Sequence, residues 1–424
     1  MKIKSNFVRY VITLSSGTIV AQAIPVAISP ILTRLYSPED FGILSIYLAI
    51  TAISGSISNG KYENAIMLPE NRQEALNIGF LCIIIALTVS IVLLIVIIFF
   101  KSFISSWFEK PQIENWLFLV PVSVLFFGVY NALRFFNIRE KNYKVIALSS
   151  IYKSTGSASV QLILGVLNTG TIGLILGQFS SYVCGNYILI RKVLIDHKLK
   201  VAFNTLTIVA AAKRYVRFPK FTLPGSLLNS VSLNIISFLI SGIYSTTILG
   251  YYSLAQRMLS LPSLVIGRSI GQVYFQQASN LRSESKCILP IFKSTLFKLC
   301  LISIPSFVAL YFIVEPVFVL IFGLEWQLAG KYAKVLIPLI AIRFVSSTLS
   351  NTMHILEKQN ITLIIQIVLL LNISIIFICA KVFGWTFLFA LYIFTISSSM
   401  MYLTFLLTYY KAIINDKEKT IRVK

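Results

Sequence analysis

The stretch at residues 78–100, IGFLCIIIALTVSIVLLIVIIFF, decides the fold class, because it runs for 23 residues without a charged side chain. About 20 apolar residues in an α-helix are enough to cross the hydrocarbon core of a bilayer. A second stretch of this kind, ITLIIQIVLLLNISIIFIC, occupies residues 361–379. Each predicts a membrane-spanning helix, and neither shows the period-2 alternation typical of a barrel strand.

The composition extends this interpretation to the whole chain of 424 residues. Hydrophobic residues make up 57% and charged residues 12% of the sequence, and the mean hydropathy is +0.83. These values exclude an ordinary soluble globular domain. We predict an all-α integral membrane protein with about twelve transmembrane helices, near residues 11–33, 42–60, 76–100, 116–136, 145–167, 172–190, 222–244, 250–276, 291–314, 331–353, 361–381 and 386–410.

An internal repeat relates the two halves of the chain. A shift of 208 places residues 7–45 on residues 215–253 without a gap and with nine identical positions. Six helices return the chain to the side on which it started, so the halves form a parallel repeat. We therefore expect two six-helix lobes around a central cavity. The predicted division is an N-terminal lobe at residues 1–190, a cytoplasmic basic linker at 191–220 and a C-terminal lobe at 221–424.

Lysine and arginine predict the orientation, because they concentrate in the short cytoplasmic loops of membrane proteins. With both termini inside, 26 of the 37 basic residues fall on the cytoplasmic side and 6 on the outer side. The net charge of +22 is thus mainly a topology signal. Since the basic residues are spread over many loops, we expect no nucleic-acid partner. Within the linker, residues 201–212 are predicted to form an amphipathic helix on the inner surface.

The remaining five basic residues lie inside predicted helices, where a charge costs at least ~2.5 kcal/mol and normally faces water or a partner. Lys298 is close enough to the inner end of its helix to reach the surface. Arg257 and Arg268 are eleven residues apart, which would place them on one face of an unbroken α-helix. We predict that Lys153, Arg257, Arg268 and Arg343 bind an anionic substrate. The alternative is structural pairing with helix-end carbonyls or acids.

Signals of catalysis and metal binding are missing from the sequence. The five cysteines have no CxxC spacing, and His197 and His354 stand alone. No P-loop, GxSxG or HExxH motif is present. We therefore expect neither a catalytic site, nor a metal, nor a cofactor, and we interpret the protein as a transporter and not an enzyme. The acidic residues all fall in predicted loops or near helix ends, which predicts a membrane interior without a carboxylate.

Stretches in both halves of the chain resemble a known family. Residues 32–42, LTRLYSPEDFG, and residues 60–69, GKYENAIMLP, are similar to the first two helices of polysaccharide-biosynthesis flippases of the O-antigen repeat-unit type. Residues 218–220, 224–229, 250–257 and 262–272 look like helices 7 and 8 of the same family. This resemblance implies membership of the multidrug, oligosaccharidyl-lipid and polysaccharide exporter superfamily.

The resemblance implies that the substrate is an undecaprenyl-pyrophosphate-linked oligosaccharide, the repeat unit of an O-antigen or a related surface polysaccharide. It also implies that the protein flips this substrate from the cytoplasmic to the outer leaflet of the bacterial inner membrane. The expected partners are this lipid-linked oligosaccharide, membrane lipids, and a polysaccharide polymerase with its chain-length regulator. Two alternatives stay open: a cation-coupled multidrug antiporter of the same superfamily, and a membrane polysaccharide polymerase or glycosyltransferase.

Overall fold

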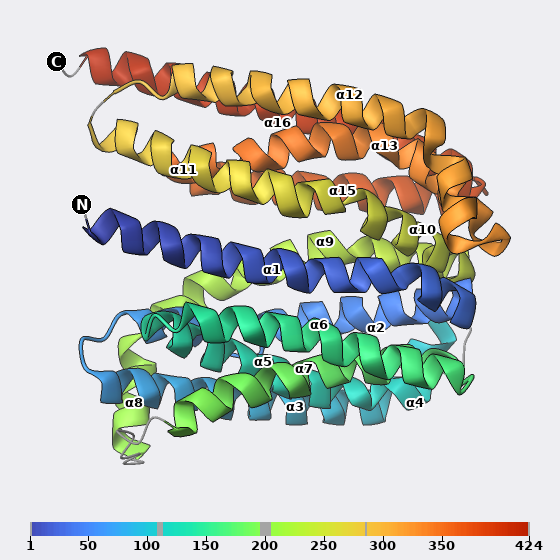
Figure 1. Cartoon of the computed structure of the whole chain (residues 1–424), viewed down its shortest axis with the longest axis horizontal. Coiled ribbons are helices and arrows are strands. Elements are labelled where there is room, and N and C mark those ends of the chain that lie inside the picture. Colours follow the sequence, from blue (N-terminus) through green and yellow to red (C-terminus); the bar gives the residue numbers. More distant parts are fainter. Residues whose placement is uncertain (1, 108–112, 196–204, 285, 423–424) are drawn as a thin grey trace. The chain divides into compact units, whose positions relative to one another are not determined.

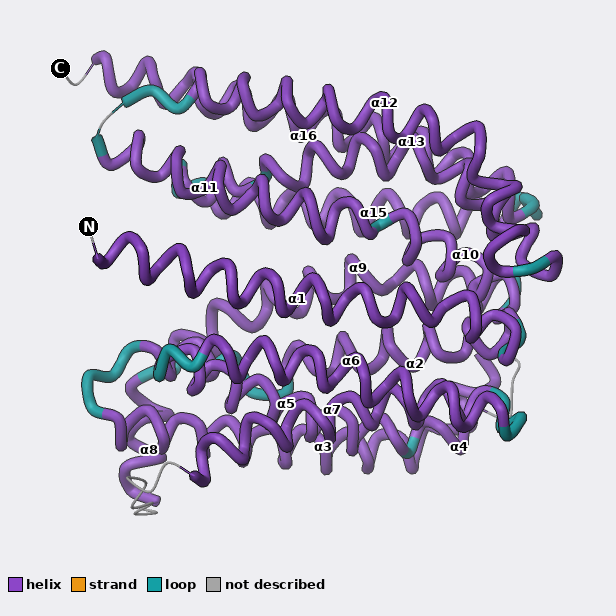
Figure 2. Tube along the Cα trace, viewed as in Figure 1, coloured by secondary structure: helices purple, strands orange, loops and turns teal. Residues whose placement is uncertain are grey.

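The computed structural model describes residues 2–107, 113–195, 205–284 and 286–422. Across this part of the chain every regular element is a helix, and no strand occurs (Figure 2). The chain divides into two compact units, unit 1 at Met1–Gly250 and unit 2 at Tyr251–Lys424.

Unit 1 contains the first six long helices, a helix across their ends, and one further long helix (Figure 1). Its elements are α1 (Lys2–Leu35), α2 (Pro38–Ile57), η1 (Tyr62–Met67), α3 (Arg72–Trp107), α4 (Ile113–Leu117), α5 (Leu119–Arg139), α6 (Tyr143–Val166), α7 (Thr171–Ile195), α8 (Thr205–Arg214), η2 (Phe218–Thr222) and α9 (Leu223–Ile243). Helix α10 (Thr246–Leu259) begins in unit 1 and ends in unit 2.

Unit 2 contains the rest of the chain. Its elements are η3 (Ser263–Gly267), α11 (Arg268–Ser283), α12 (Leu289–Phe322), η4 (Leu324–Trp326), α13 (Gln327–Leu349), α14 (Asn351–Ile355), α15 (Gln359–Val382) and α16 (Phe387–Arg422). Helix α13 packs between α12 and α16, and α15 packs against α16. Buried aromatic rings fill this unit; those of Phe307 and Phe344, for example, lie 6.4 Å apart between α12 and α13.

The predicted fold class is confirmed. Among the described residues, ten helical segments are long and apolar enough to cross a membrane. The predicted helices near 145–167 and 250–276 are helical as well but are not among these ten. Helix α6 carries Lys153 and many small polar residues, and the other segment is divided into α10, η3 and α11, each shorter than a membrane span.

Glycines allow the long helices of unit 1 to approach closely. A side chain at Gly17 of α1 would clash with Ala147 of α6, and one at Gly156 of α6 would clash with Cys184 of α7. Without water to drive apolar helices together, helix association in a membrane depends on such close packing of small residues. These contacts explain why α6 packs tightly against both α1 and α7.

The internal repeat is visible in the structure at the level of single hydrogen bonds. Ser37 caps α2 by accepting from the backbone N–H of Asp40 at 3.3 Å. At the position related by the shift of 208, Ser245 accepts from the N–H of Ile248 at 3.1 Å, at the start of α10. A serine hydroxyl at this position satisfies a backbone donor that a helix start otherwise leaves without a partner.

The starts of α2 and α10 also contact one another reciprocally. A Cβ on Gly42 would overlap the carbonyl oxygen of Thr246, and a Cβ on Gly250 would overlap the carbonyl oxygen of Pro38. The shift of 208 relates Gly42 to Gly250 and Pro38 to Thr246. Only glycine permits this backbone approach at either position.

The unit boundary lies further along the chain than the predicted start of the second lobe at residue 221. Helix α9 packs against α2, so it groups with the preceding helices in unit 1. The lobe boundaries at 190 and 221 remain predictions drawn from the repeat.

Candidate anion-binding site

A break in the helical path from α10 to α11 shapes the site in unit 2. Pro262 lacks a backbone N–H, and its ring clashes with the carbonyl four residues earlier, so it disturbs the regular α-helical hydrogen bonding at this point. The chain adopts a π-helix at η3 (Ser263–Gly267) directly after this proline. Single π-turns inside α-helices are frequent at functional sites.

A cavity of about 530 Å³ opens beside this break. Its walls come from the end of α10, from η3, and from one side each of α11 and α13, with the start of α14. The lining residues are Gln256, Ser260, Ser263, Gly267, Arg268, Gly271, Gln272, Ile340, Arg343, Ser347, Thr348 and Asn351. Gly267 lets η3 approach α13, because a Cβ there would lie 3.1 Å from the Thr348 hydroxyl oxygen.

The charge of this cavity has one sign. Arg268 on α11 and Arg343 on α13 both line it, and the lining includes no aspartate or glutamate. Across the described residues, neither guanidinium has an acidic side chain within 4.0 Å. Arginine presents a planar set of donors that matches a carboxylate or phosphate in two-point geometry. Two such groups around one volume make this cavity a candidate anion-binding site.

Uncharged polar side chains complete the lining. The hydroxyls of Ser260 and Thr348 donate to carbonyls of their own helices, at 2.9 Å to Arg257 and 2.7 Å to Phe344. Each hydroxyl oxygen thereby stays available as an acceptor. The carboxamides of Gln256, Gln272 and Asn351 offer donors and acceptors together. This mixture suits a ligand with many hydroxyl groups beside its anionic part.

Sequence reasoning found the arginines but missed these polar residues. A signal was present, because Arg343, Ser347 and Asn351 recur every four residues from α13 into α14. That spacing places them on one face. Gln256, Ser260, Ser263, Gly267 and Gly271 follow a similar spacing of three or four along α10 to α11.

The structure does not place Arg257 in this cavity. Arg257 belongs to the last turn of α10 and lies outside the lining, whereas Arg268 begins α11. The expectation of a shared face assumed an unbroken α-helix. A π-helix closes its hydrogen bonds over five residues and not four, so each of its residues advances the helix by a smaller rotation. The intervening η3 therefore shifts Arg268 away from the face of Arg257.

Lys153 belongs to unit 1, on α6. Its ammonium nitrogen lies 4.1 Å from the ring centre of Tyr130 on α5 and 4.9 Å from that of Tyr182 on α7. A cation over an aromatic face is attracted by the ring's quadrupole. Lys153 thus links three helices, and its side chain packs against Gly185, where any Cβ would collide with it. Lys298 is exposed on α12.

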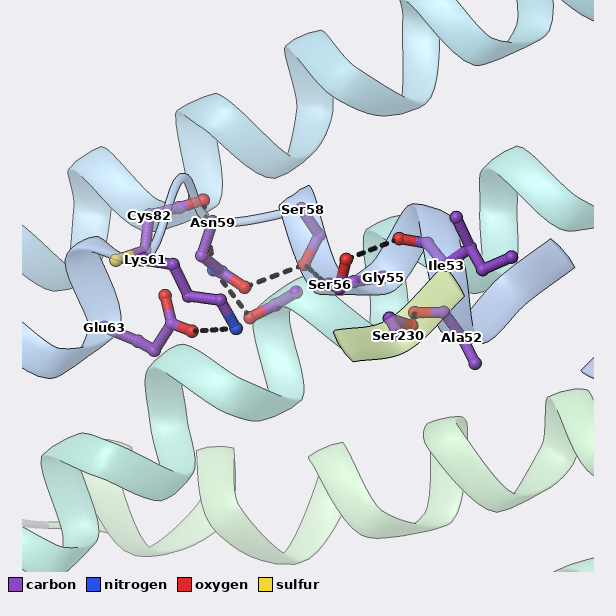
Figure 3. A network of polar contacts seen from close by, with 11 residues as sticks. Ala52, Ile53, Gly55, Ser56, Ser58, Asn59, Lys61, Glu63, Cys82 and Ser230 are labelled. Atoms are coloured by element: carbon purple, nitrogen blue, oxygen red, sulfur yellow. Dashed lines mark hydrogen bonds and ion pairs between the residues drawn. The ribbon is translucent and has the colours of Figure 1, made fainter. Parts of the chain in front are cut away.

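A carboxylate is buried in unit 1, outside the membrane spans. Glu63 lies in η1, is only 6% exposed, and pairs with Lys61 at 3.6 Å (Figure 3). Burial raises the pKa of Glu63, and the Lys61 ammonium partly opposes that shift. The preceding Asn59 fixes the turn by donating to the carbonyls of Cys82 at 3.3 Å and Gly128 at 3.0 Å. The sequence had indicated only that this acid lies in a loop.

Solved structures share the whole fold. An inward-facing transporter of the MATE family, from the MOP superfamily, matches with a TM-score of 0.70 and 12% identity, covering 97% of this chain and 95% of that one. The lipid II flippase MurJ in an inward closed conformation matches with a TM-score of 0.69 and 16% identity, covering 98% and 91%. At these identities the likeness shows the fold alone. The class is therefore a multi-pass helical membrane protein with the fold of MATE transporters and MurJ.

The chain belongs to the polysaccharide biosynthesis protein family, whose sequence profile matches residues 31–330. A membrane protein in the cps region of Klebsiella pneumoniae is 21% identical over 340 residues, covering 78% of this chain and 67% of that protein. The succinoglycan biosynthesis transport protein ExoT of Rhizobium meliloti (strain 1021) is 21% identical over 312 residues, covering 71% and 59%. The aligned region thus spans less than two thirds of the length of ExoT.

Proposed function

We propose that this protein transports a lipid-linked oligosaccharide precursor of a surface polysaccharide across the bacterial inner membrane. The observation that carries the proposal is the cavity in unit 2, where Arg268 and Arg343 provide two cations and the lining provides no carboxylate. An undecaprenyl-pyrophosphate headgroup is a doubly charged anion, for which two arginines are suitable partners. The carboxamides and hydroxyls of the lining suit the sugars.

The relatives support the same substrate class. One is encoded in a cps region, and the other is named for transport in succinoglycan biosynthesis. Membership of the polysaccharide biosynthesis family favours a polysaccharide precursor over a drug. The cavity favours the same conclusion, because an exporter of cationic drugs needs acidic groups in its binding site.

The direction we propose is from the cytoplasmic to the outer leaflet, by alternating access, with both termini in the cytoplasm. The excess of lysine and arginine in the predicted inner loops supports this orientation. The membrane potential would favour outward transport of the anionic headgroup, because an inside-negative potential drives anions outward by about 2.3 kcal/mol per charge per 100 mV. Reporter fusions after Lys424 and after Gly330 test the orientation, with the first expected inside and the second outside.

The decisive experiment is deletion of the gene followed by analysis of lipid-linked intermediates on each leaflet. Complete repeat units accumulating on the inner leaflet are the expected result. Unpolymerised units accumulating on the outer leaflet would identify a polymerase instead. Normal intermediates together with increased sensitivity to cationic drugs would identify a multidrug antiporter.

In proteoliposomes, transport is expected to respond to a potassium-diffusion potential imposed without a sodium or proton gradient. A transport rate that does not depend on the potential but rises with a sodium or pH gradient would contradict this driving force. It would point to a cation site, for which buried Glu63 is the first residue to substitute.

A further inference from the structure

Helix α8 differs from the other helices of unit 1 in its direction. The long helices run side by side, whereas α8 runs across their ends (Figure 1). It packs against α3, where Asn77 donates to the Thr207 hydroxyl at 3.0 Å and Arg214 pairs with Glu74 at 2.8 Å. Because the long helices cross the bilayer, a helix that runs across their ends lies along the membrane surface.

One face of α8 holds it to the protein. Ile208, Ala211 and Tyr215 are buried and recur at spacings of three and four residues. They belong to a hydrophobic cluster with residues of η1, α3 and α5, among them Tyr62. The Tyr62 hydroxyl also donates to the carbonyl of Ala212 at 3.0 Å. This face fixes both the position and the rotation of α8.

The opposite face and the chain that follows are exposed, and they combine apolar and basic side chains. Val209, Val216 and Phe221 are 52%, 50% and 68% exposed. Lys213, Arg217 and Lys220 are exposed among them, and residues 205–222 include no aspartate or glutamate. We call these six residues the basic strip: Val209, Lys213, Val216, Arg217, Lys220 and Phe221.

We propose that the basic strip binds the anionic phospholipid headgroups of the bilayer surface beside unit 1. In this arrangement Val209, Val216 and Phe221 enter the boundary between headgroups and acyl chains, and the three cations contact lipid phosphates. An amphipathic helix with lysine and arginine beside large apolar residues binds an interface in this way. Long basic side chains extend along the apolar boundary while their charges stay among the headgroups.

Two features favour a lipid surface over an acidic protein as the partner. The strip begins on α8, which is fixed to the ends of membrane-spanning helices, and continues through η2 at the start of the apolar segment Phe218–Ile243. Its exposed apolar side chains alternate with cations, so one planar surface with negative charge above hydrocarbon satisfies both kinds of residue. The inference does not depend on which substrate the cavity binds.

The test uses the full-length protein in nanodiscs of phosphatidylcholine alone or mixed with phosphatidylglycerol. Amide hydrogen exchange is measured across residues 205–222. We expect exchange to be at least about tenfold slower with the anionic lipid, since each cation near an anionic surface contributes about 1 kcal/mol. High salt should abolish most of this difference.

Two triple variants distinguish an effect of the basic strip from an effect of the protein's overall positive charge. The triple variant Lys213→Gln, Arg217→Gln, Lys220→Gln should lose the dependence on phosphatidylglycerol. A matched control removes three exposed cations elsewhere in unit 1, by Lys141→Gln, Lys144→Gln and Arg191→Gln. This control should keep the dependence of exchange on phosphatidylglycerol. Equal exchange of the unmodified protein in neutral and anionic discs would overturn the proposal, and so would an equal loss in both triple variants.

Discussion

In unit 1, Lys61 and Lys153 lie against partners that the protein itself supplies, a carboxylate for the first and two tyrosine rings for the second. In unit 2, Arg268 and Arg343 line an open cavity without an acidic side chain. A cation that already has a partner within the protein is expected to contribute to folding. A cation that faces a polar cavity without an acidic partner is available to a ligand, and we expect this difference to separate structural from functional charges.

The strongest test of this contrast removes both cavity arginines. Arg268→Ala with Arg343→Ala should weaken binding of a lipid diphosphate at least about 100-fold, because each charged hydrogen bond is worth about 1.5–3 kcal/mol. Binding is measured by titration of the purified protein in nanodiscs. Lys298→Ala removes an exposed cation of the same unit outside the cavity and is the control. Unchanged binding in the double variant would place the headgroup elsewhere.

Replacing either cavity arginine by lysine should have a smaller effect. Lysine keeps the charge but loses the planar pair of donors that fits a phosphate. For Arg268→Lys and Arg343→Lys, separately, we expect roughly tenfold weaker binding, the loss of about one charged hydrogen bond. A lysine variant that binds the lipid diphosphate as weakly as the double alanine variant would mean that geometry, and not charge, dominates the site.

A change in unit 1 should affect stability more than transport. Lys153→Met keeps the methylene packing but removes the cation from Tyr130 and Tyr182, at a cost of about 2 kcal/mol or less. Transport in proteoliposomes at matched protein amounts should stay within about twofold, while the unfolding midpoint falls. Loss of transport without loss of stability would instead assign Lys153 to the substrate path.

The smallest expected effect is on the pH dependence of stability and concerns the Lys61–Glu63 pair of unit 1. Since burial raises the pKa of Glu63 in the folded protein, the folded state binds more protons than the unfolded state between the two pKa values. Stability should therefore fall as pH rises through that window. Glu63→Gln removes this titration and should flatten the slope in thermal unfolding measured from acid to neutral pH. Lys61 and Cys82, which face the same carboxyl group, are left unchanged in this variant.

The sequence predicted the helical membrane fold because long apolar runs leave few other solutions in a bilayer. It also identified Arg268 and Arg343 as unusual, since a charge interrupts such a run conspicuously. It grouped these two with Lys153 and Arg257 as ligands of one anionic substrate. That Arg268 and Arg343 line the same cavity depends on the packing of α11 against α13, which the sequence does not show. It did not predict the π-turn after Pro262, which lies between Arg257, outside the cavity lining, and Arg268, within it.

Burial of Glu63 escaped sequence analysis for a different reason. Its segment follows a glycine and lies between two hydrophobic runs, which is typical of an exposed loop. In the structure Asn59 ties this turn to the carbonyls of Cys82 and Gly128, so η1 lies against α3 and α5. Hydrogen bonds between residues distant in sequence leave no pattern that a single sequence reveals.

The contact between Gly42 and Gly250 couples the two positions mechanically. A Cβ on Gly42 would overlap the carbonyl oxygen of Thr246, a Cβ on Gly250 would overlap that of Pro38, and the shift of 208 relates these two contacts to one another. Exchanging the two segments therefore leaves the contact unchanged, which is the defining property of an isologous interface in a two-fold symmetric dimer. A side chain at either glycine would displace the same pair of backbones, so both positions are expected to exclude any residue larger than glycine.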